Sequence, residues 1–335
     1  MSVRPGTTTI NARLERWPYT APFRISGYDW SEAKLVYVEI LRDGVRGRGE
    51  CAGVYYKDDS PEKCLADIER VREAIASGAG RADLAELLPE GGARNALDCA
   101  LWDLEAKTQG VPVWQLAGLE NPRPVRTTYT IGADDPAVMV ERAQAFADAR
   151  ALKLKLTGTQ EDEARVRAVR QARPDVWLAV DANQGFTRAF LEQILPAFVE
   201  TRVQLIEQPI AVGQEAQLDG FDSPIPIAAD ESVQNLADLP QLVNRFDIVN
   251  IKLDKCGGLT PALAMASAAR DLGLGVMVGN MVGTSLAMAP AFLVGQLCDV
   301  TDLDGPLLLR DDREPRIEYR DGDIWSSEAV WGGPQ

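Results

Sequence analysis

Three acidic residues of this 335-residue sequence each close a short apolar run. The runs VWLAVD, VQLIE and IPIAAD end in Asp181, Glu207 and Asp230. The intervals, 207 − 181 = 26 and 230 − 207 = 23 residues, each fit about one strand and one helix, which predicts carboxylates on neighbouring strands. Oxygen ligands without histidine or thiolate suit Mg²⁺ better than zinc or copper. Each acid could instead cap the helix that follows it, and the sequence leaves this alternative open.

Three lysines lie in neighbouring apolar runs and are candidates for acid–base chemistry beside these acids. Lys153 and Lys155 alternate with leucines in RALKLKLTG (150–158), and Lys252 closes the run DIVNIK. Because alternate residues of a barrel strand point inward, Lys153 and Lys155 are expected inside the barrel. A lysine base needs its pKa lowered from about 10.4 to roughly 7–8, and burial, a neighbouring ammonium and a divalent cation act in that direction. The alternative is an antiparallel strand with one solvated face.

The composition removes several classes of chemistry. The sequence contains no histidine, which excludes His-dependent triads, His-ligated zinc and His bases, and leaves acid–base work to Lys, carboxylates, Tyr or Cys. The five cysteines show neither zinc-site pairs nor disulfide spacing, and we interpret them as reduced, mostly buried thiols. The net charge of 35 − 50 = −15 lacks the basic footprint of a nucleic-acid or membrane binder, so small molecules are the expected partners.

The first ten residues, MSVRPGTTTI, show no cationic and apolar leader. No apolar run in the sequence approaches the length that crosses a bilayer. These features predict a cytoplasmic protein. The sequence leaves open whether identical copies assemble into a homo-oligomer.

An alternation of strands and helices begins near residue 125 and must position these side chains. Helical patterns such as PAVMVERAQAFADA and TPALAMASAARDLG separate short apolar runs, and strands that alternate with single helices pair in parallel. Eight such units close most naturally into a barrel. A flat doubly wound sheet is the alternative, although no glycine-rich phosphate loop follows the first strand. The candidate strands are 125–132, 150–156, 175–181, 202–207, 225–230, 247–252, 274–279 and 297–304.

The chain is expected to divide into three parts. The first is an α+β domain, because it combines a hairpin turning at Asp43-Gly44 with two helices of clear periodicity. The hairpin is predicted over 35–50, and the helices over about 61–78 and 93–110. The last part carries no further strand–helix unit and is expected to return to the first. The predicted boundaries are 1–117, 118–304 and 305–335.

The motif KLK, followed in order by Asp181, Glu207, Asp230 and Lys252, resembles the enolase superfamily, specifically its muconate-lactonising-enzyme-like branch. The resemblance covers nearly the whole chain. It implies an α/β fold, a (β/α)7β modified TIM barrel with an N-terminal α+β capping domain that the C-terminal tail completes. It also implies that the three acids hold one Mg²⁺, which grips a carboxylate or carboxamide oxygen of the substrate.

The same resemblance assigns roles to the amines. It implies that Lys155 and Lys252 stand on opposite faces of the substrate α-carbon and that Lys153 assists the enolate. Asn183, two residues after the first acid, would support the metal site from outside the ligand set. The roles of Asp254 and Lys255, which follow the sixth strand, are left open.

Two further acids, Asp302 and Asp304, lie in CDVTDLDGP at the end of the eighth strand, and alternation points both toward the barrel mouth. Acids aimed at a site that already holds three carboxylates call for a cation, and a protonated substrate amine is the obvious one. Their pattern resembles the Asp-x-Asp of dipeptide epimerases, where it binds the α-ammonium of the substrate's N-terminal residue. A turn-forming Asp-Gly would account for Asp304 alone.

Two segments of the first domain, 21–30 and 51–59, resemble the family loops that close over the substrate. Arg24 in the first segment is expected to pair with a side-chain carboxylate of an Ala-Glu-like dipeptide, and a solvated strand residue is the alternative. The second segment is less regular than the family pattern, which leaves the side-chain specificity open.

Taken with the resemblance, these residues predict a Mg²⁺-dependent dipeptide epimerase, an isomerase that inverts the α-carbon of the C-terminal residue by 1,1-proton transfer between two lysines. The alternatives within the superfamily are N-acylamino acid racemase, o-succinylbenzoate synthase and muconate cycloisomerase, whose substrates offer no ammonium to the eighth strand. Outside the superfamily, a Schiff-base aldolase with Lys155 or Lys252 as nucleophile and a non-catalytic binding barrel stay open.

Overall fold

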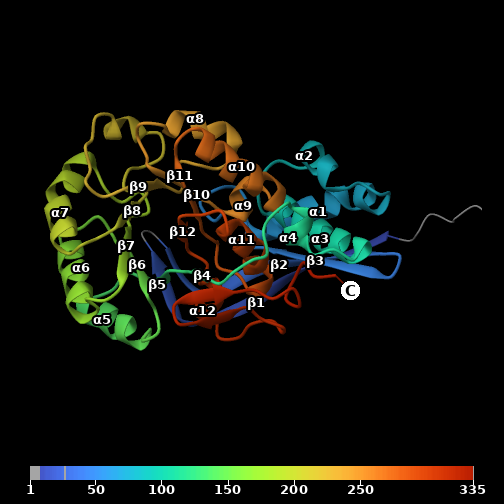
Figure 1. Ribbon diagram of the computed structural model, residues 1–335, viewed down its shortest axis with the longest axis horizontal. Helices are drawn as coiled ribbons and strands as arrows, with labels where there is room; N and C mark the ends of the chain where they lie inside the picture. The colour runs from blue at the N-terminus through green and yellow to red at the C-terminus, as the bar shows by residue number, and fades with distance from the viewer. Residues whose placement is uncertain (1–7, 26–27, 335) are drawn as a thin grey trace, which may run out of the picture.

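The computed structural model describes residues 8–25 and 28–334, whose arrangement Figure 1 shows. A parallel eight-stranded sheet with outer helices occupies one side of the molecule. An antiparallel three-stranded sheet, also with helices, occupies the other side. A small third sheet joins the last two strands of the chain to a strand that precedes the barrel.

The eight-stranded sheet forms the barrel. Its strands lie side by side in chain order without a crossover, which excludes the doubly wound alternative and confirms the predicted fold class. At the seam, the Thr128 N–H donates to the Thr301 carbonyl at 3.0 Å and connects the two edges of the sheet. The strands are β5 (Tyr129–Ile131), β6 (Ala151–Lys155), β7 (Trp177–Asp181), β8 (Leu205–Glu207), β9 (Ile227–Ala229), β10 (Ile248–Ile251), β11 (Gly275–Val278) and β12 (Val300–Thr301).

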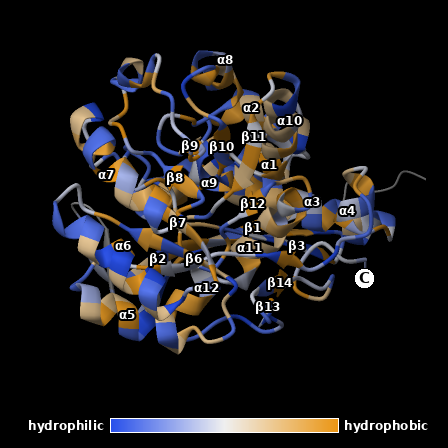
Figure 2. Cartoon of the chain, turned by 60° about the vertical axis from the view of Figure 1, so that its left-hand side comes forward, coloured by the Kyte–Doolittle hydropathy of each residue, from blue (hydrophilic) through white to orange (hydrophobic). Residues whose placement is uncertain are grey.

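Helices cover the outer face of the barrel, and their packing decides which strand residues point inward. They are α5 (Pro136–Ala145), α6 (Glu161–Ala172), α7 (Arg188–Glu200), α8 (Leu239–Leu242), α9 (Leu253–Cys256), α10 (Leu259–Asp271), α11 (Ser285–Gly295) and α12 (Gly305–Leu308). Figure 2 shows hydrophilic and hydrophobic positions along α5, α6 and α7, as expected of helices with one buried face. Leu152 and Leu154 of β6 share the outer core with Val166 and Val169 of α6. Burying such side chains contributes about 1.5–3 kcal/mol each, which fixes the register of β6.

The N-terminal domain is built on an antiparallel sheet. Its strands, in pairing order, are β1 (Thr8–Ile25), β2 (Tyr28–Arg42) and β3 (Val45–Cys51). The predicted hairpin is confirmed, and its turn consists of Asp43 (φ 53°) and Gly44 (φ 80°). Positive φ at both central residues is the turn geometry that Asp-Gly favours between two strands.

Both predicted helices of this domain are also present. Helix α1 (Pro61–Ala76) begins at Ser60, whose side chain accepts the Lys63 N–H, and α3 (Gly92–Gln109) ends at Gly110, where φ is 66°. An oxygen at the first position and a left-handed glycine at the last are the usual helix boundaries. Shorter turns over Arg81–Asp83, Leu84–Leu87 and Val113–Leu116 complete the domain.

Two elements differ from the sequence prediction. The long strand β1 was not expected, because two prolines interrupt its apolar residues and prolines favour edge strands over central ones. The strand predicted over 125–132 divides into β4 (Val125–Arg126) and β5. Between them the Thr127 N–H donates to the Gly322 carbonyl and the Thr128 N–H to Thr301, so the chain changes from one sheet to another.

The C-terminal tail contacts the N-terminal domain. Its strands β13 (Glu318–Arg320) and β14 (Asp323–Trp325) form a sheet with β4. Near the end of the chain the Trp331 Nε1–H donates to the Arg48 carbonyl at 2.9 Å. The tail therefore lies against both the barrel and the first sheet.

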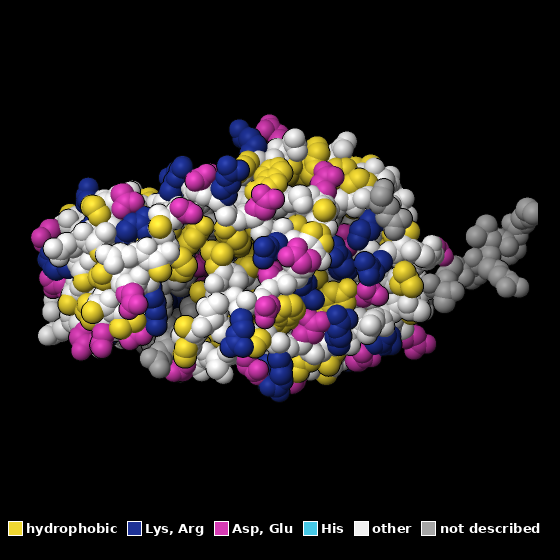
Figure 3. Space-filling model, turned by 90° about the horizontal axis from the view of Figure 1, so that it is seen from below, with side chains coloured by type: hydrophobic (Ala, Val, Ile, Leu, Met, Phe, Trp, Pro, Cys, Tyr) yellow, Lys and Arg dark blue, Asp and Glu magenta, His cyan; other side chains and the backbone are white. Residues whose placement is uncertain are grey.

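The surface carries charges of both signs, and the cysteines are free, as the sequence composition predicts. Figure 3 shows positive and negative side chains interspersed over the face it presents. Among the helices of residues 8–25 and 28–334, none is both long and apolar enough to span a bilayer. All five cysteines are free thiols and four of them are buried, as predicted.

A buried ion pair holds the tail, the barrel and β3 together. Glu50 on β3 is 2% exposed, and its carboxylate accepts hydrogen bonds from Arg313 Nη2 at 2.6 Å and from the Thr284 N–H at 2.8 Å. Arg313 also donates to Glu15 at 2.5 Å. Burial raises the pKa of Glu50 although Arg313 opposes that shift, so this carboxylate depends on its partners to stay charged.

We expect Arg313→Ala to lower the free energy of unfolding by about 3–5 kcal/mol, because it leaves the Glu50 charge buried without its partner. Urea denaturation measures the change. The matched control is Arg316→Ala, whose side chain is 65% exposed and lies 3.7 Å from Glu314, and which should cost less than about 0.5 kcal/mol. Equal losses in the two variants would contradict a stabilising role for the buried pair.

Candidate active site

Charged side chains gather where the barrel strands end. Lys153 and Lys155 of β6 are only 2% and 7% exposed and face the interior of the barrel. In the sheet register Lys155 lies beside Asp181, which lies beside Glu207. Lys155 Nζ is 2.5 Å from Asp181 Oδ2, and Lys153 Nζ is 3.4 Å from Glu207 Oε2. Because β6 is parallel to its neighbours and buried, the solvated antiparallel strand is excluded.

Asp230 is held by two lysines. Lys252 Nζ donates to its Oδ2 at 2.6 Å. Lys255 Nζ donates to its Oδ1 and to its carbonyl, each at 2.6 Å, and to the Asn250 carbonyl at 2.9 Å. Burial alone would raise the pKa of Asp230, but both ammonium groups lower it well below its usual range. With its three N–H donors occupied, Lys255 has a structural role, which the sequence left open.

Lys155 and Lys252 lie across the barrel from each other. Strands β6 and β10 are four positions apart in the eight-strand order and therefore stand on opposite sides of the ring. Both side chains line one cavity of about 530 Å³, a volume within the usual range for small-molecule sites. The cavity thus has an amine on each side.

The three predicted metal ligands are buried next to one another. Burial and the charge of Asp181 raise the pKa of Glu207 to about 7, in spite of Lys153. Glu207 Oε1 accepts a hydrogen bond from Asn250 Nδ2 at 2.7 Å, whereas Oε2 is buried without a hydrogen bond and has Lys153 Nζ 3.4 Å away. A buried carboxylate oxygen without a donor suits a hard cation, and with Asp181 and Asp230 it makes the all-oxygen donor set that Mg²⁺ prefers.

The lysines, however, occupy two of these acids. Within the described residues no three His, Cys, Asp or Glu side chains are already arranged as a metal-binding group. Asp181 is paired with Lys155 and Asp230 with Lys252. The capping alternative is not observed for these acids, because Thr187 caps α7 and Asn235 caps the turn that follows β9.

The neighbouring carboxylates raise the pKa of two lysines. Burial alone would lower the pKa of Lys252, but Asp230 and Glu207 raise it well above its ordinary value. The pKa of Lys153 is also raised, since Asp302 and Glu207 outweigh burial. The raised pKa belongs to this arrangement, in which the carboxylates pair with amines, and the lowering expected beside a divalent cation stays a prediction. A divalent cation bound to the same carboxylates would withdraw these partners from the lysines.

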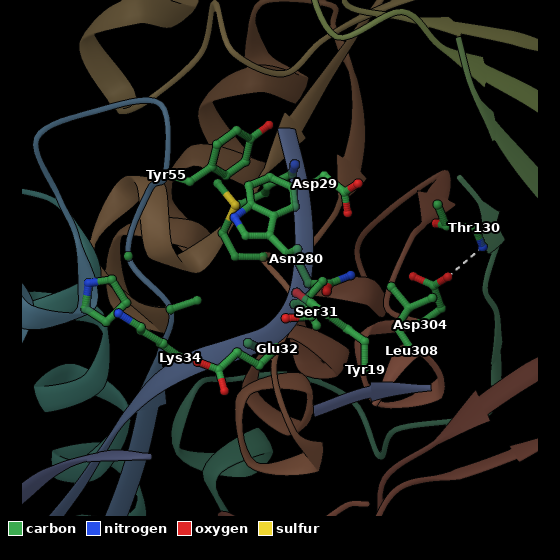
Figure 4. Close-up of a pocket in the computed structure, with 18 of the residues that line it drawn as sticks. Tyr19, Asp29, Ser31, Glu32, Lys34, Tyr55, Thr130, Asn280, Asp304 and Leu308 are labelled. Carbon is green, nitrogen blue, oxygen red and sulfur yellow. Dashed lines mark hydrogen bonds between the residues drawn. The ribbon is translucent and has the colours of Figure 1, made fainter. Parts of the chain in front are cut away.

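Asp302 and Asp304 follow β12 and both line the same cavity. Asp302 accepts hydrogen bonds from Lys153 Nζ and from Thr128 Oγ1. Asp304 Oδ2 accepts the Thr130 N–H at 2.6 Å, drawn as a dashed line in Figure 4. Burial and the charge of Asp302 raise the pKa of Asp304 to about 6. A turn role for Asp304 alone does not explain why two acids are buried at one cavity.

The N-terminal domain covers this cavity. Tyr55 and Asp29 of that domain line it together with Asn280 and Asp304 of the barrel (Figure 4). Arg24 lies on β1, where its backbone pairs with that of Asp29. Its side chain falls outside the described residues, so its role in substrate binding stays a prediction.

Sequence reasoning missed two polar residues of the site. Asn250, the hydrogen-bond donor to Glu207, stands two residues before Lys252, so alternation along β10 could have identified it. Glu231 is 3% exposed and accepts a hydrogen bond from Asn183 Nδ2 at 3.3 Å. Burial and the neighbouring Asp230 raise its pKa to about 8. No spacing signal points to Glu231, because it directly follows Asp230 and does not share that residue's place in the two-residue alternation.

Two family models match the chain. The model for the N-terminal domain of mandelate racemase / muconate lactonizing enzyme matches residues 7–118, and the "enolase C-terminal domain-like" model matches residues 138–330. Over 318 residues the chain is 38% identical to the L-Ala-D/L-Glu epimerase of Escherichia coli (strain K12), an alignment that covers 94% of this chain and 99% of the relative. Over 252 residues it is 43% identical to the N-acetyl-D-glutamate racemase of a Pseudoalteromonas species, with coverages of 75% and 79%.

Solved structures show the same similarity. An enolase family member from Agrobacterium tumefaciens, described as having homology to dipeptide epimerases and holding sodium and L-Ala-L-Glu, superimposes with a TM-score of 0.94 at 42% identity, covering 97% of this chain and 100% of the other. The dipeptide epimerase of Methylococcus capsulatus, complexed with Mg and L-Arg-D-Lys, gives 0.89 at 31% identity, with coverages of 97% and 99%. These matches confirm the predicted family: the chain belongs to the mandelate racemase / muconate lactonizing enzyme family of the enolase superfamily.

Proposed function

We propose that this protein is a Mg²⁺-dependent dipeptide epimerase that inverts the α-carbon of the C-terminal residue. One observation carries the proposal: Lys155 and Lys252 face one cavity from opposite sides of the ring, and Asp302 and Asp304 line the same cavity. Opposed amines suit the removal of a proton from one face of a carbon and its return to the other. Paired acids suit a substrate ammonium. The relatives named as dipeptide epimerases support this activity.

The residues of the cavity divide the chemistry among them. Asp181, Glu207 and Asp230 would hold Mg²⁺, which supplies Lewis-acid stabilisation of the charge that develops on the substrate. One of the opposed lysines removes the α-proton and the other returns a proton to the opposite face, so the configuration inverts. Lys153, whose Nζ is 3.4 Å from Glu207 Oε2, adds a positive charge that stabilises the negative charge developing on the substrate. Since either opposed lysine can begin, the enzyme works in both directions.

The two acids after β12 have different capacities for the substrate ammonium. Asp302 already accepts hydrogen bonds from Lys153 and Thr128, and therefore also positions Lys153. Asp304 accepts one backbone N–H, from Thr130, through Oδ2. We assign the main contact with the ammonium to Asp304.

We also propose that the domain predicted over 1–117 caps the cavity, that 118–304 carries the strand-end groups, and that the tail predicted over 305–335 completes the capping domain. Asn183 supports the metal site through Glu231. A cytoplasmic location is in keeping with the free thiols, and assembly of identical copies stays a prediction.

A second candidate is an N-acylamino acid racemase, because the Pseudoalteromonas relative is named for a substrate without an α-ammonium. The same opposed lysines would serve that reaction. Asp304 favours the dipeptide, since a second acid buried beside Asp302 has no electrostatic purpose for an uncharged acyl group.

We expect Lys155→Ala and Lys252→Ala each to lower the epimerisation of L-Ala-L-Glu by about 10²–10⁴-fold, because each removes one of the two proton carriers. In D₂O each variant should still exchange the α-hydrogen of one diastereomer only, and the two variants should prefer opposite diastereomers. NMR measures the exchange.

Lys63→Ala, on the outer surface of α1, is the control. Activity that survives EDTA, together with borohydride trapping of a carbonyl substrate, would favour the aldolase.

The ammonium contact is tested with N-propionyl-L-glutamate, which keeps the heavy atoms of alanyl-glutamate except the amine. We expect its kcat/KM to be about 10²-fold lower than that of L-Ala-L-Glu, because Asp304 loses its ionic partner. Asp304→Asn should lower kcat/KM for the dipeptide strongly and for the propionyl compound little. Equal use of both compounds by the wild type would instead select the N-acylamino acid racemase.

Metal binding is tested without an activity assay. At a hundredfold excess over its Kd, Mg²⁺ should raise the free energy of unfolding by about 2.7 kcal/mol, because it binds the folded state. Glu207→Gln should abolish this response, and Glu163→Gln on the surface should keep it. Calorimetry with and without EDTA measures both. A full response in Glu207→Gln would contradict the assigned ligand set.

A further inference from the structure

A buried carboxylate outside the proton-transfer machinery connects the N-terminal domain to the turn that follows Lys252. Asp254 lies in α9, two residues beyond Lys252, and is 6% exposed. Its Oδ1 accepts hydrogen bonds from the backbone N–H groups of Ala52 and Gly53, each at 3.0 Å. The Asn95 side chain hydrogen-bonds the same carboxylate. Burial raises the pKa of Asp254 to about 7, and the backbone hydrogen bonds from Ala52 and Gly53 oppose that shift.

Ala52 and Gly53 begin the covering loop, which we define as residues 52–60. A bridge closes this loop, since the Val54 N–H donates to the Asp59 carbonyl at 3.0 Å. Gly53 adopts φ 70°, and a Cβ there would lie 2.1 Å from the Asp59 carbonyl oxygen. Only glycine fits such a position, so the loop is tightly folded on its own first residues.

The covering loop brings Tyr55 to the cavity and Tyr56 to the barrel. Tyr55 lines the cavity together with Ala52 and Gly53, and its ring packs edge-on against Trp30 at 5.2 Å between centroids. Figure 4 shows Tyr55 at the end of the cavity away from Asp304. The Tyr56 hydroxyl accepts a hydrogen bond from Gln234 Nε2, on the barrel, at 3.1 Å. The start of the loop is thus fixed by Asp254 and its tip by Gln234.

We propose that Asp254 is a positioning residue that holds the covering loop over the cavity and thereby sets the affinity for the dipeptide. Asp254 and Lys252 share one short turn of backbone, so the loop and the amine are fixed to the same element. A loop that is released from this turn leaves the cavity less enclosed, which weakens substrate binding more than the chemistry. The inference rests on the proposed epimerase function.

The test compares two substitutions at one position. Asp254→Leu removes the acceptor and should raise KM for L-Ala-L-Glu about tenfold while kcat changes less than about threefold. Asp254→Asn keeps an acceptor oxygen and should keep KM within about threefold of the wild type. Without any substrate, backbone amides of residues 52 and 53 should exchange with D₂O faster in the Leu variant. If Asp254→Leu does not fold, Asp254→Ser replaces it, because the shorter side chain cannot reach the Ala52 and Gly53 N–H groups.

Asp98 provides a matched control. It is another buried carboxylate between the N-terminal domain and the barrel, and it accepts the Thr260 N–H at 2.9 Å and the Thr260 hydroxyl at 2.6 Å. Asp98 does not belong to the described residues that line the cavity. Asp98→Leu should lower Tm and leave KM within about threefold. An unchanged KM in Asp254→Leu, or an equal rise in Asp98→Leu, would overturn the proposal. A wild type without epimerase activity would refute the proposed function instead, while the amide exchange would still report on the loop.

Discussion

The structure of the site depends on pairing opposite charges in the buried mouth of the barrel. Isolating one such charge from water costs several kcal/mol, so each lysine needs a carboxylate and each carboxylate needs a donor or a cation. Lys155 lies against Asp181 and Lys252 against Asp230. The same pairs limit the chemistry, because a paired ammonium is a poor base and a paired carboxylate is a poor ligand. Cation and substrate must therefore redistribute the partners before a proton can move.

Several features of this site follow from simple periodicities and were predictable. A two-residue alternation on β6 sends leucines to the helices and lysines to the interior. An interval of about one strand and one helix brings Asp181 and Glu207 into direct register. The eight strands were found by the same rhythm, although β12 is much shorter than the predicted run. Both the alternation and the interval depend only on residues that are close in sequence or on strands that are adjacent in the sheet.

Features that depend on distant segments were not predictable from the pattern. Glu231 owes its environment to Asn183 and Asp230, and nothing in its own neighbourhood marks it. The raised pKa of Lys252 depends on which carboxylate happens to face it, which the spacing of strands does not specify. The link from Asp254 to Ala52 joins segments about 200 residues apart. Strand β1 forms because a partner strand is available, in spite of its prolines.

The ion pair between Glu50 and Arg313 has a consequence for biosynthesis. The two residues are 263 positions apart, so a ribosome produces the carboxylate long before the guanidinium that neutralises it. Until then the early sheet can bury Glu50 only as an uncompensated charge or as a protonated acid, and either form costs free energy. Its final packing is thus delayed until almost the entire polypeptide has emerged, and a transcript cut short before codon 313 yields a product whose first domain is incompletely assembled.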